Sequence, residues 1–261
     1  MHLNYYRAGS GEPLVLIHGL GLRWQTWEPV LPRLTAERDV VVIDLPGFAD
    51  SPPPPPGAPA SIASLSRLVG EFLDQLGLER PHVAGNSLGG WLSLELAQLG
   101  RARSATALSP AGFGNQRERE YARIALGTTR KLTRLIAPQA DRLVRSRAGR
   151  ALLFPLAVYR PLRLRPEAAA RIVRGFASAV WFDEVLATLT NDRFTGGDQL
   201  QVPVTIAWGE HDRLQFPRQA GRAARAIPSA RVITLRGCGH VPMSDDPEQV
   251  ARVLLEGSAG G

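Results

Sequence analysis

The chain has 261 residues, which suits one domain with a large core and an insertion rather than two independent domains. Its 44% hydrophobic and 21% charged residues are typical of a globular protein, and no run approaches the roughly 20 apolar residues of a membrane-spanning helix, which argues against a transmembrane anchor. The net charge of +7 lies in one region, because residues 113–200 hold 15 arginines and one lysine against eight acidic residues.

Two further features concern location and stability. The segment Met1–Ser10 has no basic stretch followed by an apolar one, so we expect no secretory signal and a cytoplasmic protein. The single cysteine, Cys238, has no partner for an internal disulfide, and no cluster of Cys and His has the spacing of a zinc site. We therefore expect stability to come from packing.

In the first 109 residues, short apolar runs alternate with amphipathic stretches. This pattern predicts an α/β fold in which parallel strands are buried under helices on both faces. A surface helix is expected after Ser61, a good N-cap residue, and it ends at Gly77. The expected strands are Pro13–His18, Asp39–Asp44, His82–Asn86 and Ser104–Ser109.

The alternation stops after Ser109, where about ninety residues show helical periodicity without a convincing strand. It resumes with strands at Val204–Trp208 and Arg231–Leu235, and with helices near Phe216–Ala226 and Pro247–Glu256. We therefore predict a core of residues 1–112 and 200–261 with an inserted helical cap, residues 113–199.

A G-x-S-x-G pattern, Gly85–Gly90, lies directly after one predicted strand and before a predicted helix. Small residues beside Ser87 permit a sharp strand-to-helix turn, which raises the serine oxygen above the sheet at a helix N-terminus. The simpler alternative is a Gly-rich turn that only connects strand to helix. The other motifs favour a nucleophilic serine.

Those motifs lie in loops that follow three other predicted strands. The first, His18–Gly21, is Gly-rich and suited to direct main-chain N–H groups at an oxyanion, with Leu20 and Leu88 as the expected donors. His18 itself is expected to be structural. Asp212 and His240 follow two later strands, and their order after Ser87 matches the Ser…Asp…His order of a hydrolase triad.

Taken together, the motifs resemble the signatures of the α/β-hydrolase superfamily over almost the whole chain. The resemblance implies an eight-stranded, mostly parallel sheet, with the serine turn after the fifth strand and a helical cap between the sixth and seventh. The motifs are HGLG at 18–21, DLPGFADS at 44–51, GNSLGG at 85–90, WGEHD at 208–212 and GCGHVP at 237–242.

By position in these motifs, the resemblance implies that Ser87 is the nucleophile, Asp212 the acid and His240 the base, with Leu20 and Leu88 as oxyanion donors. A serine at the turn argues against haloalkane dehalogenases and epoxide hydrolases, which are similar but use an aspartate there. The chemistry predicted for such a site is cleavage of a carboxylic ester, thioester or lipid ester through an acyl-enzyme, with no metal or organic cofactor.

Two alternatives remain open. The GNSLGG turn is also similar to that of hydrolases that cleave carbon–carbon bonds in ring-fission products, although those enzymes usually carry a tryptophan after the catalytic histidine and this chain has Val241. A catalytically silent member of the fold that only binds a ligand is the other alternative. The complete triad argues against it.

The remaining predictions concern substrate and partners. Trp24, Trp27, Trp181 and Phe182 are candidates for an acyl or aromatic pocket, although core packing is the alternative for each. The segment Asp141–Arg165 interleaves apolar side chains with arginines, a pattern that suits contact with an anionic membrane, or else a solvated lid. No nucleic-acid-binding motif accompanies the charge, so we expect no nucleic-acid partner.

Overall fold

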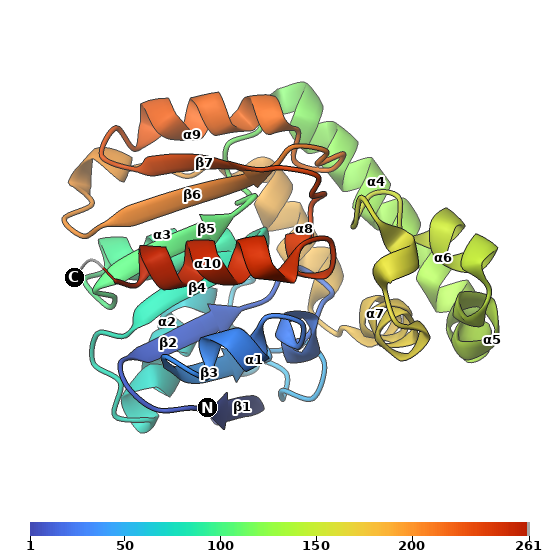
Figure 1. Cartoon of the computed structure of the whole chain (residues 1–261), viewed down its shortest axis with the longest axis horizontal. Helices are drawn as coiled ribbons and strands as arrows, with labels where there is room; N and C mark the ends of the chain where they lie inside the picture. The colour runs from blue at the N-terminus through green and yellow to red at the C-terminus, as the bar shows by residue number, and fades with distance from the viewer. Residues whose placement is uncertain (260–261) are drawn as a thin grey trace.

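The computed structural model describes residues 1–259, which fold around one twisted sheet (Figure 1). The strand order is β1-β3-β2-β4-β5-β6-β7, and every neighbouring pair is parallel except β1 and β3. This arrangement confirms the predicted α/β fold class. The strands are β1 (Tyr5–Ala8), β2 (Pro13–Ile17), β3 (Asp39–Ile43), β4 (His82–Asn86), β5 (Ser104–Leu108), β6 (Val204–Gly209) and β7 (Arg231–Leu235).

Within residues 1–259 the sheet has seven strands, so the expected count of eight is wrong. Six strands had been predicted from apolar runs, and the other two rested on the resemblance alone. Residues 1–12 form only one of these, the edge strand β1, followed by a turn through Gly9 and Gly11. The turn at Ser87 therefore follows the fourth strand, and the helical insertion lies between the fifth and sixth.

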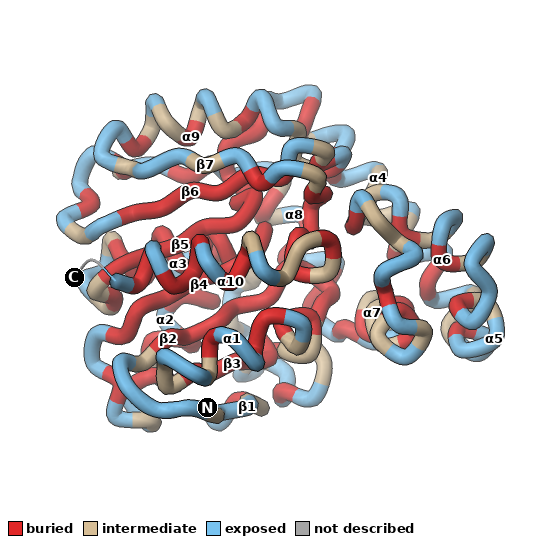
Figure 2. Tube along the Cα trace, viewed as in Figure 1, coloured by how far each residue is buried: buried red, intermediate tan, exposed pale blue. Residues whose placement is uncertain are grey.

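Helices cover both faces of the sheet. The helices α2 (Ile62–Gln75), α3 (Leu88–Gln98) and α9 (Ala220–Ala226) pack into one apolar cluster with side chains of the strands. On the opposite face, α1 (Leu31–Leu34) and α10 (Pro247–Gly257) pack into a second cluster (Figure 1). The central strands β4 and β5 are buried along their whole length (Figure 2), which explains why small or apolar residues fill all their positions except His82 and Asn86.

The predicted helix after Ser61 forms, and the Ser61 hydroxyl accepts a hydrogen bond from the Ser64 main-chain N–H at 3.1 Å. Short 3-10 turns complete the chain between the longer elements. They are η1 (Trp24–Trp27), η2 (Ala137–Gln139), η3 (Pro161–Arg163), η4 (Gly197–Gln199), η5 (Pro217–Gln219) and η6 (Pro242–Ser244).

Five helices lie between β5 and β6, and we call residues 113–199 the cap. They are α4 (Gln116–Ile136), α5 (Ala140–Arg145), α6 (Arg147–Leu153), α7 (Pro166–Ser178) and α8 (Phe182–Asn191). The long helix α4 leaves the sheet, and α5, α6 and α7 gather at one end of the molecule (Figure 1). No helix in the described part of the chain is long and apolar enough to cross a membrane.

Candidate active site

Ser87 occupies a strained turn between β4 and α3. Its backbone has φ of 58° and ψ of −112°, a conformation that residues other than glycine rarely adopt. Close packing explains the neighbouring glycines, because a Cβ atom on Gly85 would lie 2.1 Å from the Gly89 carbonyl oxygen, and one on Gly89 would lie 2.1 Å from that of Ile17. The turn leaves Ser87 at the N-terminus of α3, on the wall of a cavity.

Asp212 and His240 form a buried pair beside this turn. The His240 Nδ1 atom lies 2.7 Å from Asp212 Oδ2. The other carboxylate oxygen of Asp212 accepts hydrogen bonds from the main-chain N–H groups of Leu214 and Gln215, both at 2.8 Å. With Nδ1–H donating to the carboxylate, the tautomer is fixed and the Nε2 atom of His240 is left to accept a proton.

Ser87 and His240 both line the same cavity. Among residues 1–259 the structure records no direct hydrogen bond between the Ser87 hydroxyl and the His240 ring. Contacts of this kind are often long in a ligand-free site and shorten when substrate binds. The structure therefore brings the three predicted triad residues to one place, with the Asp212–His240 contact already formed.

The predicted oxyanion donors flank the serine. Leu20 lines the cavity in the loop after β2, and a Cβ atom on the adjacent Gly19 would lie 3.3 Å from Ser87 Cβ. Leu88 is the first residue of α3, where main-chain N–H groups have no carbonyl partner within the helix. One N–H group thus belongs to a loop that lies close to Ser87, and the other to the residue that follows it.

His18 holds the Leu20 loop in place. Its Nδ1 atom lies 2.7 Å from the Gly19 carbonyl oxygen, and its Nε2 atom accepts a hydrogen bond from the Leu45 main-chain N–H at 3.0 Å. The ring is fully buried, and burial lowers the pKa of His18, with the nearby Asp44 carboxylate opposing that effect. This arrangement agrees with the structural role predicted for His18.

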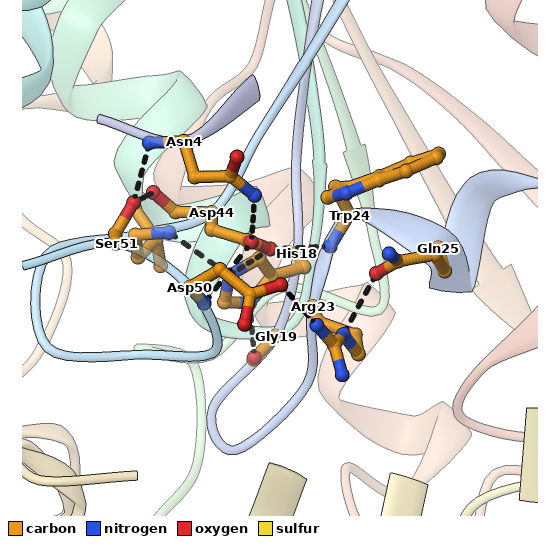
Figure 3. A network of polar contacts seen from close by, with 10 residues as sticks. Asn4, His18, Gly19, Arg23, Trp24, Gln25, Asp44, Asp50 and Ser51 are labelled. Atoms are coloured by element: carbon orange, nitrogen blue, oxygen red, sulfur yellow. Dashed lines mark hydrogen bonds and ion pairs between the residues drawn. The ribbon is translucent and has the colours of Figure 1, made fainter. Parts of the chain in front are cut away.

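A polar network around Asp44 supports the same loop (Figure 3). The buried Asp44 carboxylate accepts hydrogen bonds from the Asn4 side chain and the Trp24 main-chain N–H, both at 2.7 Å. The Ser51 hydroxyl donates to the Asp44 carbonyl oxygen at 2.6 Å and accepts from the Asn4 main-chain N–H at 2.9 Å. The motif at 44–51 therefore connects β1, β3 and the Leu20 loop.

Two residues that the sequence did not single out hold the His240 loop. The Asn86 side chain, next to Ser87, donates to the His240 carbonyl oxygen at 2.8 Å. The buried Asp245 carboxylate accepts from the main-chain N–H groups of Gly239 at 2.8 Å and, in the cap, of Tyr159 at 3.0 Å and Arg160 at 2.6 Å. Asn86 lay inside a recognised motif, but Asp245 had no sequence signal because its partners in the cap, Tyr159 and Arg160, are 85 or more residues away.

The cavity at Ser87 has a volume of about 230 Å³. The polar residues that line it are few: Asn86, Ser87, Arg119, Thr129, Thr133, Thr190, Gln215 and His240. Most of its wall is apolar and comes from the cap, including Leu126, Leu132, Ile136, Leu152, Ile172 and Phe176. The arrangement suits a ligand with a hydrocarbon portion and one reactive polar group.

The aromatic residues predicted for a substrate pocket lie elsewhere. Trp27 is fully buried in the apolar cluster on the α1 side, while Trp181 and Phe182 are buried in the cluster on the other face. The Phe182 ring packs against Phe176 with a centroid distance of 5.3 Å, and the Trp24 ring stacks on Tyr6 at 5.0 Å. These residues therefore pack in or against the core, which was the alternative considered for each. The aromatic residue that lines the cavity is Phe176.

Cys238 is buried beside the histidine loop, and burial raises the pKa of its thiol to about 12. The thiol is therefore protonated at neutral pH and unsuited to nucleophilic chemistry. Among the described residues, no group of three or more His, Cys, Asp or Glu side chains is placed to hold a metal ion.

Comparison with known proteins agrees with the fold described above. A model of the alpha/beta hydrolase family matches residues 14–253. The dihydrolipoyllysine-residue acetyltransferase component of an acetoin cleaving system from Pseudomonas putida is 28% identical over 97% of this chain, which spans 65% of that relative's length. Lipase 1 of Psychrobacter immobilis is 26% identical, with 93% of this chain and 75% of the lipase covered. A thermophilic esterase from Thermogutta terrifontis has the same fold, with a TM-score of 0.73 at 22% identity over 97% of this chain and 92% of the esterase.

Proposed function

The chain belongs to the alpha/beta hydrolase family, and on that premise we propose that it cleaves carboxylic esters with apolar acyl groups through an acyl-enzyme on Ser87. The observation that carries the proposal is the convergence of Ser87 and the Asp212–His240 pair on one largely apolar cavity. Similarity to a lipase and to the fold of an esterase supports the same class of reaction.

In the proposed mechanism, His240 Nε2 accepts the Ser87 hydroxyl proton as the serine oxygen attacks the ester carbonyl. The negatively charged Asp212 stabilises the imidazolium that forms, through the 2.7 Å contact at Nδ1. The carbon–oxygen bond to the alcohol then breaks, and His240 returns the proton to the departing alcohol. A water molecule that gives its proton to His240 attacks the acyl-enzyme; the bond to the Ser87 oxygen then breaks, His240 returns the proton to that oxygen, and the acid is released.

The oxyanion of each tetrahedral intermediate would accept hydrogen bonds from the Leu20 and Leu88 main-chain N–H groups. Removing one donor of this kind typically raises the barrier by about 3–4 kcal/mol. The His18 contacts would hold the Leu20 donor in position, and the turn at Ser87 puts the Leu88 donor at the first residue of α3. The acyl chain would occupy the apolar wall that the cap supplies.

The test is hydrolysis of p-nitrophenyl esters from acetate to palmitate by the wild type, Ser87→Ala and a matched control, Ser229→Ala, at an exposed serine of the core. We expect activity in the wild type and control and a loss of at least about 10⁴-fold in kcat for Ser87→Ala. Undiminished activity in Ser87→Ala would refute the nucleophile. Inactivity of the wild type on every ester would favour carbon–carbon cleavage or a silent binding role.

A further inference from the structure

Three leucines on the cap have large exposed surfaces. Leu132 and Leu135, on the last turns of α4, are 45% and 78% exposed, and Leu152 on α6 is 79% exposed. Leu132 and Leu135 are three residues apart and therefore adjacent on the helix surface. Isolated exposed leucines are common, but a group of them on one end of a molecule marks a surface for contact.

This group lies at the Ser87 cavity. Leu132 and Leu152 both line that cavity while remaining exposed to solvent, so they belong to its opening. The neighbouring lining residues Ile136 and Leu153 are partly buried and continue the apolar surface inward. A hydrocarbon chain that enters between Leu132 and Leu152 therefore stays in contact with apolar side chains as it moves toward Ser87.

Exposed cations lie on the same two helices as the leucines, α4 and α6, and on the intervening α5. Lys131, Arg142, Arg145 and Arg147 are exposed, and no ion pair is recorded for them with any residue from 1 to 259. Other cap arginines differ, since Arg174 pairs with Asp141 at 2.7 Å. Residues 131–165 contain nine Arg or Lys and one acidic residue, so this end of the cap carries the excess charge of the chain. In Figure 1, α5 and α6 lie together with the end of α4, at the opposite end of the molecule from the last turn of α10.

We propose that this surface, Leu132, Leu135 and Leu152 with Lys131, Arg142, Arg145 and Arg147, docks on an anionic lipid bilayer. The charge selects the partner, because a surface with cations and exposed leucines but almost no carboxylates complements acidic headgroups above a hydrocarbon layer. The inference rests on the proposed function in one respect. It identifies the substrate as a lipid ester whose acyl chain passes from the bilayer into the cavity.

The experiment is sedimentation of the whole protein with vesicles of phosphatidylcholine alone or mixed with phosphatidylglycerol. We expect binding to the mixed vesicles only, weakened by added salt. The triple variant Arg142→Gln, Arg145→Gln, Arg147→Gln should lower the partition coefficient about 100-fold, and Leu135→Ser about tenfold. The matched controls are Arg80→Gln, Arg225→Gln, Arg252→Gln together, and Leu99→Ser, which alter exposed side chains of the core and should bind as the wild type does.

Hydrolysis of a soluble p-nitrophenyl ester without vesicles reports whether each variant is folded and active. None of Leu135, Arg142, Arg145 and Arg147 lines the cavity, so this rate should stay unchanged. Equal binding to neutral and anionic vesicles, or full binding by the triple variant, would overturn the proposal. Dimerisation that Leu135→Ser abolishes would do the same by identifying a second copy as the occupant. Binding to anionic vesicles without any esterase activity would refute the proposed function but leave the docking surface standing.

Discussion

The His18 ring offers a test of the loop that carries the Leu20 donor. Burial lowers its pKa, so the ring should remain neutral, with the proton on Nδ1, below pH 6.5. The unfolded chain binds a proton near pH 6.5 and the folded one does not, so this residue makes the free energy of unfolding fall with decreasing pH below 6.5, by up to about 1.4 kcal/mol per unit. Nitrogen-15 chemical shifts of the imidazole between pH 7.5 and 5 give the measurement. A ring charged on both nitrogens at pH 6 would show that the Asp44 carboxylate outweighs burial.

Residues of the site differ in how far the sequence predicted them. Ser87, Asp212 and His240 were placed together because the carboxyl ends of parallel strands meet at one edge of a sheet, and the structure brings them there. Asp245 was not predicted, because the main-chain N–H groups that its carboxylate accepts from the cap are far away in the sequence. Trp27 was assigned to a pocket by nearness to the Leu20 loop, but nearness in sequence does not fix which way a side chain points.

The strand–turn–helix unit around Ser87 contains glycines whose surroundings leave no room for a side chain. Gly89→Ala would place a methyl group against the Ile17 backbone, so we expect the free energy of unfolding to fall by about 3 kcal/mol and activity to fall strongly. Gly127→Ala is the matched control, because that position in α4 has open space, and we expect stabilisation by up to about 1 kcal/mol there. Urea denaturation measures both changes. Equal stability of Gly89→Ala and the wild type would show that β2 and α3 can separate without cost.

Elements with a strong apolar pattern were predictable, and elements defined by tertiary contacts were not. The six predicted strands all form, and their bounds agree to within a residue. The edge strand β1 was missed because its residues are largely exposed and pair with β3 on one side only. The cap was predicted to be helical, but its division into α4 to α8 required turns at Ser146 and Trp181 that a continuous helical periodicity does not reveal.

At the scale of the whole molecule, several polar contacts join the cap to the core, and two groups of them lie beside segments that line the Ser87 cavity. At the start of α4, the buried Glu118 carboxylate binds Arg218 and Arg222 of the core. Near the catalytic loop, the Val241 main-chain N–H donates to the Ala157 carbonyl oxygen at 2.7 Å. The cap segment from Ala157 to Arg163 and the His240 loop are therefore joined as one structural unit.

Asp245 is the central residue of that unit, since it accepts main-chain N–H groups from both segments. Asp245→Asn keeps the side-chain volume but removes the negative charge and replaces one carboxylate oxygen, an acceptor, with an NH₂ donor. We therefore expect the free energy of unfolding to fall by about 2–4 kcal/mol. If the contact also positions His240, kcat on a p-nitrophenyl ester should fall about tenfold at a temperature where the variant is fully folded. Asp192→Asn, at an exposed carboxylate of the cap, is the control for charge loss and should change neither quantity. A destabilised variant with unchanged kcat would mean that Asn86 and Val241 are sufficient to hold His240, and that Asp245 only secures the cap.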